Sequence, residues 1–138
     1  MPLTVRVDAA QRVCYTVATG TVTDADVLDT YGGELANPAF DPALDQIFDG
    51  RAIDRVEVTS DALRTLADLV VDVDGALPPG IHPRVAIVVP TDVAFGLARM
   101  YQAYCESRGT PKQYYVCRSM DEAHRWMQLD ETARESES

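Results

Sequence analysis

The sequence predicts a single α/β domain in which an opening β-hairpin is followed by alternating strands and helices on a mainly parallel sheet. Two β-type runs separated by a short turn fill the first 22 residues. After them, stretches with helical spacing of apolar residues alternate with short apolar runs. One of these runs, residues 85–89 (VAIVV), has no polar residue at all, as in a parallel strand covered on both faces. We therefore expect helical crossovers between parallel neighbours and helices flanking the sheet.

The length and composition fit one domain. The chain has 138 residues, of which 46% are hydrophobic, and a domain of this size needs no disulfide or metal to fold. We expect the domain to cover residues 1–130. Residues 131–138 are polar and acidic, and we expect them to form a disordered tail.

The opening hairpin is predicted from residue alternation. Apolar and polar residues alternate over residues 3–7, and residues 13–22 are rich in Val, Thr and Tyr. Residues 8–11 lie between the two runs and form the predicted turn.

A capping signal marks the start of the first helix. Thr23 and Asp26 have the spacing of a capping box, in which each side chain bonds the other residue's backbone amide. An apolar stripe at helical spacing follows: Val27, Leu28, Tyr31 and Leu35. Gly32 and Gly33 each weaken a helix by about 1 kcal/mol relative to Ala, so we expect the helix to bend or end early.

The middle of the chain is predicted to hold a short strand and a second helix. The strand covers residues 46–49 and ends at the Asp-Gly-Arg sequence of residues 49–51, and residues 52–58 form an irregular or extended lead-in. The helix starts near residues 59–61. Its apolar face contains Leu63, Leu66, Ala67 and Val70. A loop rich in Asp, Gly and Pro is expected from Asp72 to Gly80.

Two further strand–helix units complete the domain. The buried strand at residues 85–89 precedes the longest predicted helix, residues 92–107, which Gly109 and Pro111 end. The apolar stripe expected on this helix is Val93, Leu97, Met100, Tyr101 and Tyr104. Residues 113–116 (QYYV) form the last strand. Ser119 and Glu122 then have capping-box spacing and open the final helix.

The charge balance excludes several partners. The formal net charge is −10, and no basic run or basic helix face is present, so we expect no binding to nucleic acid or to an anionic membrane. No segment approaches the roughly 18 apolar residues of a membrane span. The first residues lack the basic start and apolar run of a signal peptide. A cytoplasmic location is therefore predicted.

The residues that usually carry chemistry are not grouped. Cys14, Cys105 and Cys117 form no CxxC pair, which favours free thiols over a disulfide framework or a zinc site. His82 and His124 have no metal-ligand spacing. The chain also lacks the G-x-S-x-G element of hydrolases and the phosphate-binding P-loop. We expect no metal, no cofactor and no enzymatic activity.

The candidate binding residues are expected at the carboxyl edge of the sheet. Asp49, followed by Arg51, ends a predicted strand at the edge where open α/β sheets gather ligands. Helix starts at Thr59, Ser60, Thr91 and Ser119 would be receptive to an anion, although capping alone also explains these Ser and Thr residues. Asp61, beside Ser60, belongs to the helix start that is expected to meet a partner. Arg99 could bind an anion, but internal pairing with Asp49 or Asp92 is favoured.

Three segments of the C-terminal half form a recognisable pattern: VAIVVPTDVAFGLARMYQAY, QYYVCRSM and DEAHRWM. They resemble the SpoIIAA-like family, whose fold is related to the STAS domains of anti-anti-sigma factors. The first segment contains the aromatic-Gly-x-x-Arg-Met-aromatic pattern of Phe95, Gly96, Arg99, Met100 and Tyr101. The turn from Gly20 to Asp26 and the strand end at residues 49–51 also fit, so the resemblance spans nearly all of residues 1–130.

The resemblance implies a function that the residues themselves do not. STAS domains bind other proteins under control of a phosphorylated Ser or Thr at a helix start, and here that position falls near Ser60, in the sequence Val-Thr-Ser-Asp. The expected function is thus a non-enzymatic regulatory or protein-interaction domain, with another protein as partner and a homodimer possible. The alternative is a protein that binds a small molecule or anion, or an enzyme, with its site at the carboxyl edge of the sheet.

Overall fold

The computed structural model describes residues 2–37 and 39–128 and confirms the predicted fold class. Five strands form one mixed sheet in the order β1-β2-β3-β4-β5, with β1 antiparallel to β2 and the other neighbours parallel. The expectation of a disordered tail at residues 131–138 lies outside the described residues.

The opening hairpin consists of β1 (Leu3–Asp8) and β2 (Val13–Thr23), as predicted. Its register places Leu3 opposite Ala18 and Asp8 opposite Val13. In the turn, the carboxylate of Asp8 accepts a hydrogen bond of 3.1 Å from the Gln11 amide, and Arg12 adopts a positive φ of 57°. The first strand is an edge strand, since only β2 pairs with it.

The capping box that opens α1 (Asp24–Ala36) is confirmed. The Asp26 carboxylate accepts a hydrogen bond of 2.9 Å from the Thr23 amide, and the Thr23 hydroxyl accepts one of 3.3 Å from the Asp26 amide. The expectation of an early end is wrong, because the helix continues through Gly32 and Gly33. Tyr31 and Leu35 pack against the core, and this packing outweighs the low helix propensity of glycine.

The third strand, β3 (Asp45–Glu57), is much longer than predicted. It continues past Asp49 and pairs with β2 as far as Glu57, with two register shifts along the way. The long partner strand explains the difference, because β2 offers unpaired backbone groups up to Thr23. Gly50 lies at the point where β3 passes beyond β4: a Cβ there would stand 2.8 Å from the Val88 carbonyl oxygen.

The remaining elements are α2 (Ser60–Asp74), β4 (Arg84–Val88), α3 (Asp92–Ser107), β5 (Gln113–Cys117) and α4 (Met120–Gln128). The predicted helix starts are confirmed. The loop expected from Asp72 begins later, because α2 continues to Asp74, whose side chain is buried beside Lys112.

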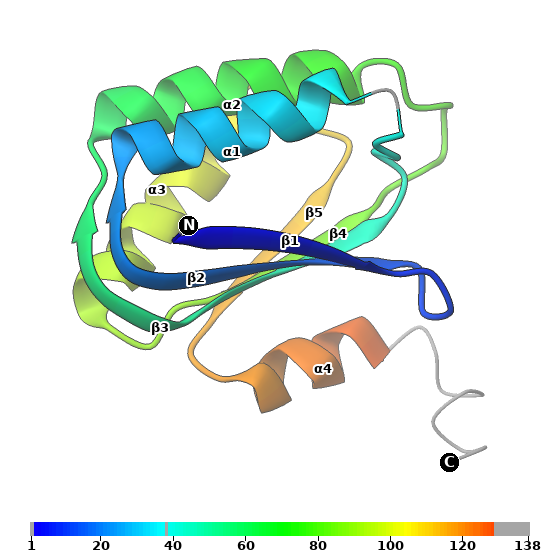
Figure 1. The fold of residues 1–138 in the computed structure, drawn as a ribbon. Coiled ribbons are helices and arrows are strands. Elements are labelled where there is room, and N and C mark those ends of the chain that lie inside the picture. Colours follow the sequence, from blue (N-terminus) through cyan, green and yellow to red (C-terminus); the bar gives the residue numbers. More distant parts are fainter. Residues whose placement is uncertain (1, 38, 129–138) are drawn as a thin grey trace.

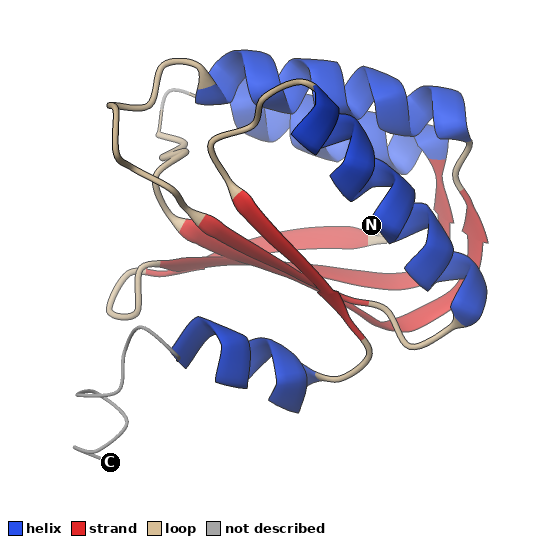
Figure 2. Cartoon of the chain, turned by 180° about the vertical axis from the view of Figure 1, so that it is seen from behind, coloured by secondary structure: helices blue, strands red, loops and turns tan. Residues whose placement is uncertain are grey.

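The helices cover the two faces of the sheet unequally. Helices α1, α2 and α3 lie on one face, and α4 lies alone on the other (Figures 1 and 2). Strand β4 is buried on both faces, as predicted: Val85 and Ile87 pack on the side of α3, and Ala86 and Val88 on the side of α4. Within the described ranges, no helix combines the length and apolar character that crossing a membrane requires.

The apolar face of α3 differs from the predicted stripe. Val93 is 67% exposed and Met100 38%, whereas Ala94 and Cys105 are buried. The core-facing row is Ala94, Ala98, Tyr101 and Cys105, which also has helical spacing. A hydrophobicity pattern gives small alanines little weight, so the prediction favoured Val93 and Met100 over Ala94 and Ala98.

Candidate functional site

A cavity of about 130 Å³ lies between the sheet and the three-helix layer. Strands β2 to β5 form its floor, and α1, α2 and α3 form its roof. Figure 1 shows β2 and β3 curling towards the starts of α1 and α2, and Val22 and Val56, near the carboxyl ends of these strands, line the cavity. Its walls are mostly apolar, with Val27, Leu66, Val70 and Ile87 among them.

The size of the cavity restricts what it can hold. An apolar cavity of roughly 150 Å³ admits a molecule the size of benzene, whereas pockets for drug-sized ligands measure about 300–1,000 Å³. At about 130 Å³, the cavity fits one small ring or a short chain. It is too small for a nucleotide or a membrane lipid.

One end of the cavity is polar. Thr16 near the start of β2, Gln46 at the start of β3, Glu34 in the last turn of α1, and Lys112 just before β5 all line it. This end therefore lies at the amino ends of the parallel strands. The sequence had placed its candidate site at the opposite edge.

Lys112, the only lysine in the chain, is buried with a carboxylate partner. Its ammonium nitrogen lies 3.2 Å from Oδ1 of Asp74, and the exposed fractions of the two side chains are 2% and 0%. Neither carboxylate oxygen of Asp74 has a hydrogen-bond partner within residues 2–37 and 39–128. Burial raises the pKa of Asp74, although the nearby ammonium group of Lys112 acts in the opposite direction.

Glu34 presents a free carboxylate oxygen next to this pair. The Cys14 thiol donates to Oε1 of Glu34 across 3.7 Å, whereas Oε2 is buried and has no hydrogen-bond partner among the described residues. Burial raises the pKa of Glu34, and the Cys14 hydrogen bond and the charge of Lys112 partly offset it. Burial and the neighbouring Glu34 also raise the pKa of the Cys14 thiol to about 11.

Neutral side chains complete the surroundings of Lys112. Tyr101 and Tyr114 meet edge to face with ring centroids 5.9 Å apart, close to the fully buried Cys105. Burial raises the pKa of both phenols and of the Cys105 thiol. All three cysteines are free, as predicted, and their raised pKa values keep the thiols protonated and weakly nucleophilic at neutral pH.

The predicted residues Asp49 and Arg51 lie apart from the cavity. Arg51 donates to both carboxylate oxygens of Asp49, from Nε and Nη2, at 2.9 Å each. These hydrogen bonds lower the pKa of Asp49. Because Phe48 faces the three-helix layer, strand alternation directs Asp49 to the face that carries α4.

The predicted helix-start residues act as caps. The hydroxyls of Thr59 and Thr91 accept hydrogen bonds of 3.2 and 3.3 Å from the amides of Ala62 and Ala94. The Asp24 carboxylate accepts hydrogen bonds of 2.7 Å from both the amide and the hydroxyl of Thr59. A carboxylate of the chain itself therefore already lies at the start of α2, where an anion was expected to bind.

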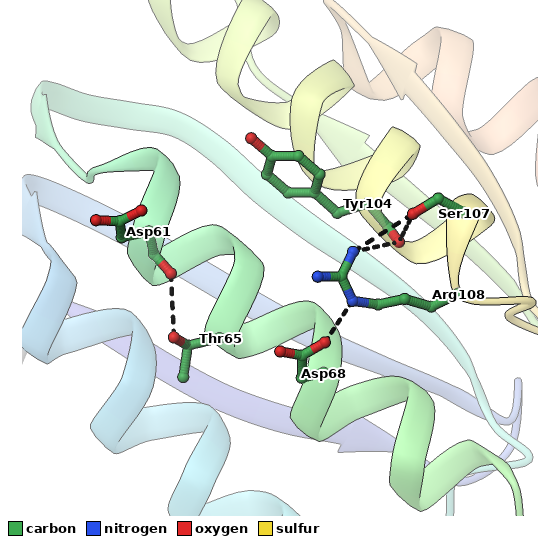
Figure 3. Close-up of polar contacts among 6 residues, drawn as sticks. All are labelled: Asp61, Thr65, Asp68, Tyr104, Ser107 and Arg108. Carbon is green, nitrogen blue, oxygen red and sulfur yellow. Dashed lines mark hydrogen bonds and ion pairs between the residues drawn. The ribbon is translucent and has the colours of Figure 1, made fainter.

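Asp61 and its neighbours on α2 take part in exposed polar contacts. Asp61 pairs with Arg64 at 2.9 Å, and Figure 3 shows Thr65 donating to the Asp61 carbonyl one turn back. Arg108, just after α3, binds Asp68 of α2 and the Tyr104 carbonyl of α3, and so joins these two helices (Figure 3). None of these polar contacts brings the predicted site residues together.

The internal pairing expected for Arg99 is not observed. The Arg99 side chain is exposed and makes no hydrogen bond or ion pair with any described residue. Its two expected partners are bound elsewhere, Asp49 by Arg51 and Asp92 by Arg118 at 2.8 Å.

Sequence reasoning missed the polar end of the cavity, although two signals point to it. Glu34 lies on the apolar side of α1, three residues after Tyr31 and next to Leu35, where an acidic residue is out of place. Lys112 is the single lysine among eleven arginines. No local pattern could have paired Lys112 with Asp74, because 38 positions separate them and the contact depends on the tertiary fold.

No cluster of His, Cys, Asp and Glu able to hold a metal ion occurs in the part of the chain that the structure describes. A comparison with protein-family models finds no match, and comparisons with the curated proteins and with the solved structures find none either.

Proposed function

We propose that this protein binds a small, largely apolar molecule in the cavity between the sheet and the three-helix layer. The observation that carries the proposal is the cavity itself, about 130 Å³ in volume, with apolar walls and one polar end. A well-packed domain has few voids larger than a water molecule, and the presence of a space of this volume supports the proposal. The ligand would be about the size of benzene.

The experiment is a methyl NMR titration with toluene, observing the Val, Leu and Ile signals of the protein. We expect chemical shift changes confined to cavity residues such as Val27, Leu66 and Ile87. For a ligand of this size we expect a dissociation constant of about 0.1–1 mM, which corresponds to roughly −5.5 to −4 kcal/mol.

Two alanines of α3 provide matched variants. Ala98 lines the cavity, whereas Ala103 is exposed on the same helix. Ala98→Leu fills part of the space and should weaken toluene binding at least about 10-fold, which corresponds to about 1.4 kcal/mol. Ala103→Leu should leave binding unchanged. Toluene that causes no shift in the cavity methyl groups, or that binds both variants equally, contradicts the proposal.

Membership of the SpoIIAA-like family and a regulatory role through a protein partner are also proposals. They are supported by the quoted sequence segments and by an α/β fold with an opening hairpin. The surface concerned is the start of α2 at Thr59, Ser60 and Asp61. We give this role second place, because the Asp24 carboxylate already accepts the Thr59 hydrogen bonds at that helix start. We also propose that the protein is cytoplasmic and that it can form a homodimer.

A further inference from the structure

The polar end of the cavity has hydrogen-bonding capacity that the protein leaves unused. The Lys112 ammonium group carries three N–H donors, and its only ionic partner among the described residues is Asp74. On the other side, Oε2 of Glu34 is buried and accepts no hydrogen bond from any described residue. Both Lys112 and Glu34 line the cavity, whereas Asp74 does not. A donor and an acceptor therefore border the same small space.

The charges at this end favour a neutral ligand group. A ligand carboxylate would be attracted by Lys112 but repelled by Asp74 and Glu34. A ligand ammonium group would be attracted by the two acids but would meet the Lys112 cation in the same buried space. Because an unpaired charge is costly to bury, neither ion suits the site. A hydroxyl group carries no charge and offers both one donor and acceptor lone pairs.

Resting on the proposed function, we propose that the ligand is a neutral hydroxyl compound with a ring-sized apolar body, such as a phenol or a cyclic alcohol. Its hydroxyl donates to Oε2 of Glu34 and accepts from the Lys112 ammonium group. The apolar body occupies the space between Val27, Leu66, Val70 and Ile87. This arrangement gives Oε2 of Glu34 a donor and gives the Lys112 ammonium group a second partner besides Asp74.

The test compares three probes of similar size: toluene, phenol and benzoate. Methyl NMR titrations on the wild-type protein should give a dissociation constant for phenol that is at least about 10-fold lower than that for toluene, because a hydrogen bond to a buried carboxylate strengthens binding. Benzoate should bind more weakly than phenol. Equal affinity for toluene and phenol, or tighter binding of benzoate, would overturn the inference while leaving the proposed function standing. If none of the three binds, both fail.

Variants of Glu34 test whether the ligand hydroxyl binds at this residue. Glu34→Met removes the acceptor with little change in length, so phenol affinity should fall about 10-fold to the level of toluene, while toluene still binds. Glu34→Gln keeps a carbonyl acceptor and should retain part of the preference for phenol. The control Glu106→Met changes an exposed glutamate of α3 and should have no effect. Continued preference for phenol in a folded Glu34→Met protein contradicts the inference.

Discussion

Two buried charges dominate the energetics at the scale of single residues. Lys112 lies in the loop before β5, and Asp74 lies at the end of α2. Their side chains meet where neither reaches solvent. Removing two charges from water costs several kcal/mol each, and their mutual attraction offsets this cost only while both are present. The pair therefore fixes how α2 and β5 fit together more than it adds net stability.

The first prediction concerns the separation of this pair. Lys112→Met leaves Asp74 as an uncompensated buried charge and should lower the free energy of unfolding by about 3–5 kcal/mol. Asp74→Leu combined with Lys112→Met removes both charges and should recover most of the loss. Urea unfolding of the wild type and the two variants measures this. A double variant as unstable as the single one would show that the pair does not act as a unit.

The second prediction concerns pH and Glu34. Its pKa is raised in the folded protein by burial, against the opposing effects of the Cys14 thiol and the Lys112 cation, with Tyr31 also nearby. A raised pKa means that the folded state holds the proton more tightly than the unfolded state. The contribution of this proton to the free energy of unfolding is fully present below the ordinary pKa of Glu. It is lost as the pH rises through the raised pKa of Glu34 in the folded protein.

Glu34→Gln replaces the carboxyl group with an amide that does not ionise. The free energy of unfolding of this variant relative to the wild type should therefore increase between pH 5 and pH 8. Each unit of pKa elevation corresponds to about 1.4 kcal/mol. Urea unfolding of both proteins at the two pH values gives the comparison. An advantage of the variant that is equal at both pH values, or larger at pH 5, would contradict the assigned direction of the shift.

At the scale of elements, the sequence predicted the features that depend on local interactions. The starts of α1, α2 and α3 were correctly placed because Thr23, Thr59 and Thr91 each bond an amide in the first turn. The continuous apolar run of residues 85–89 correctly indicated a strand buried on both faces. Capping and burial on both faces leave a signature within a few residues, so no tertiary information was needed.

The features that sequence reasoning missed depend on distant partners. Strand β3 continues to Glu57 along β2, and Asp74, the last residue of α2, pairs with Lys112, which lies 38 positions further along the chain. The cavity was not predicted for the same reason. Helix starts are visible in a sequence, whereas a cavity depends on how Leu66, Tyr101 and Ile87 meet across layers. The sequence held two signs of it: Glu34, an acid on an apolar helix face, and Lys112, the single lysine.

At the scale of the whole molecule, the two faces of the sheet are protected unequally. Helices α1 to α3 lie over one face, whereas α4 is the only described helix on the other face (Figure 2). That helix has 9 residues and holds to β4 and β5 through Ala123, Met127 and the partly buried Trp126. An isolated helix of this length is unstable in water, so its stability comes entirely from this contact.

The last prediction follows from this imbalance. We expect α4 to open locally with a lower free energy than the rest of the domain, so its amide hydrogens should exchange faster than those of α2 under native conditions. Met127→Ala should speed exchange in α4 further, because it removes a buried side chain from the contact, while leaving exchange in α2 nearly unchanged. Hydrogen exchange followed by mass spectrometry separates the two helices. Amides of α4 as strongly protected as those of α2 would show that the domain opens only as a whole, and that a single short helix is enough to secure the second face.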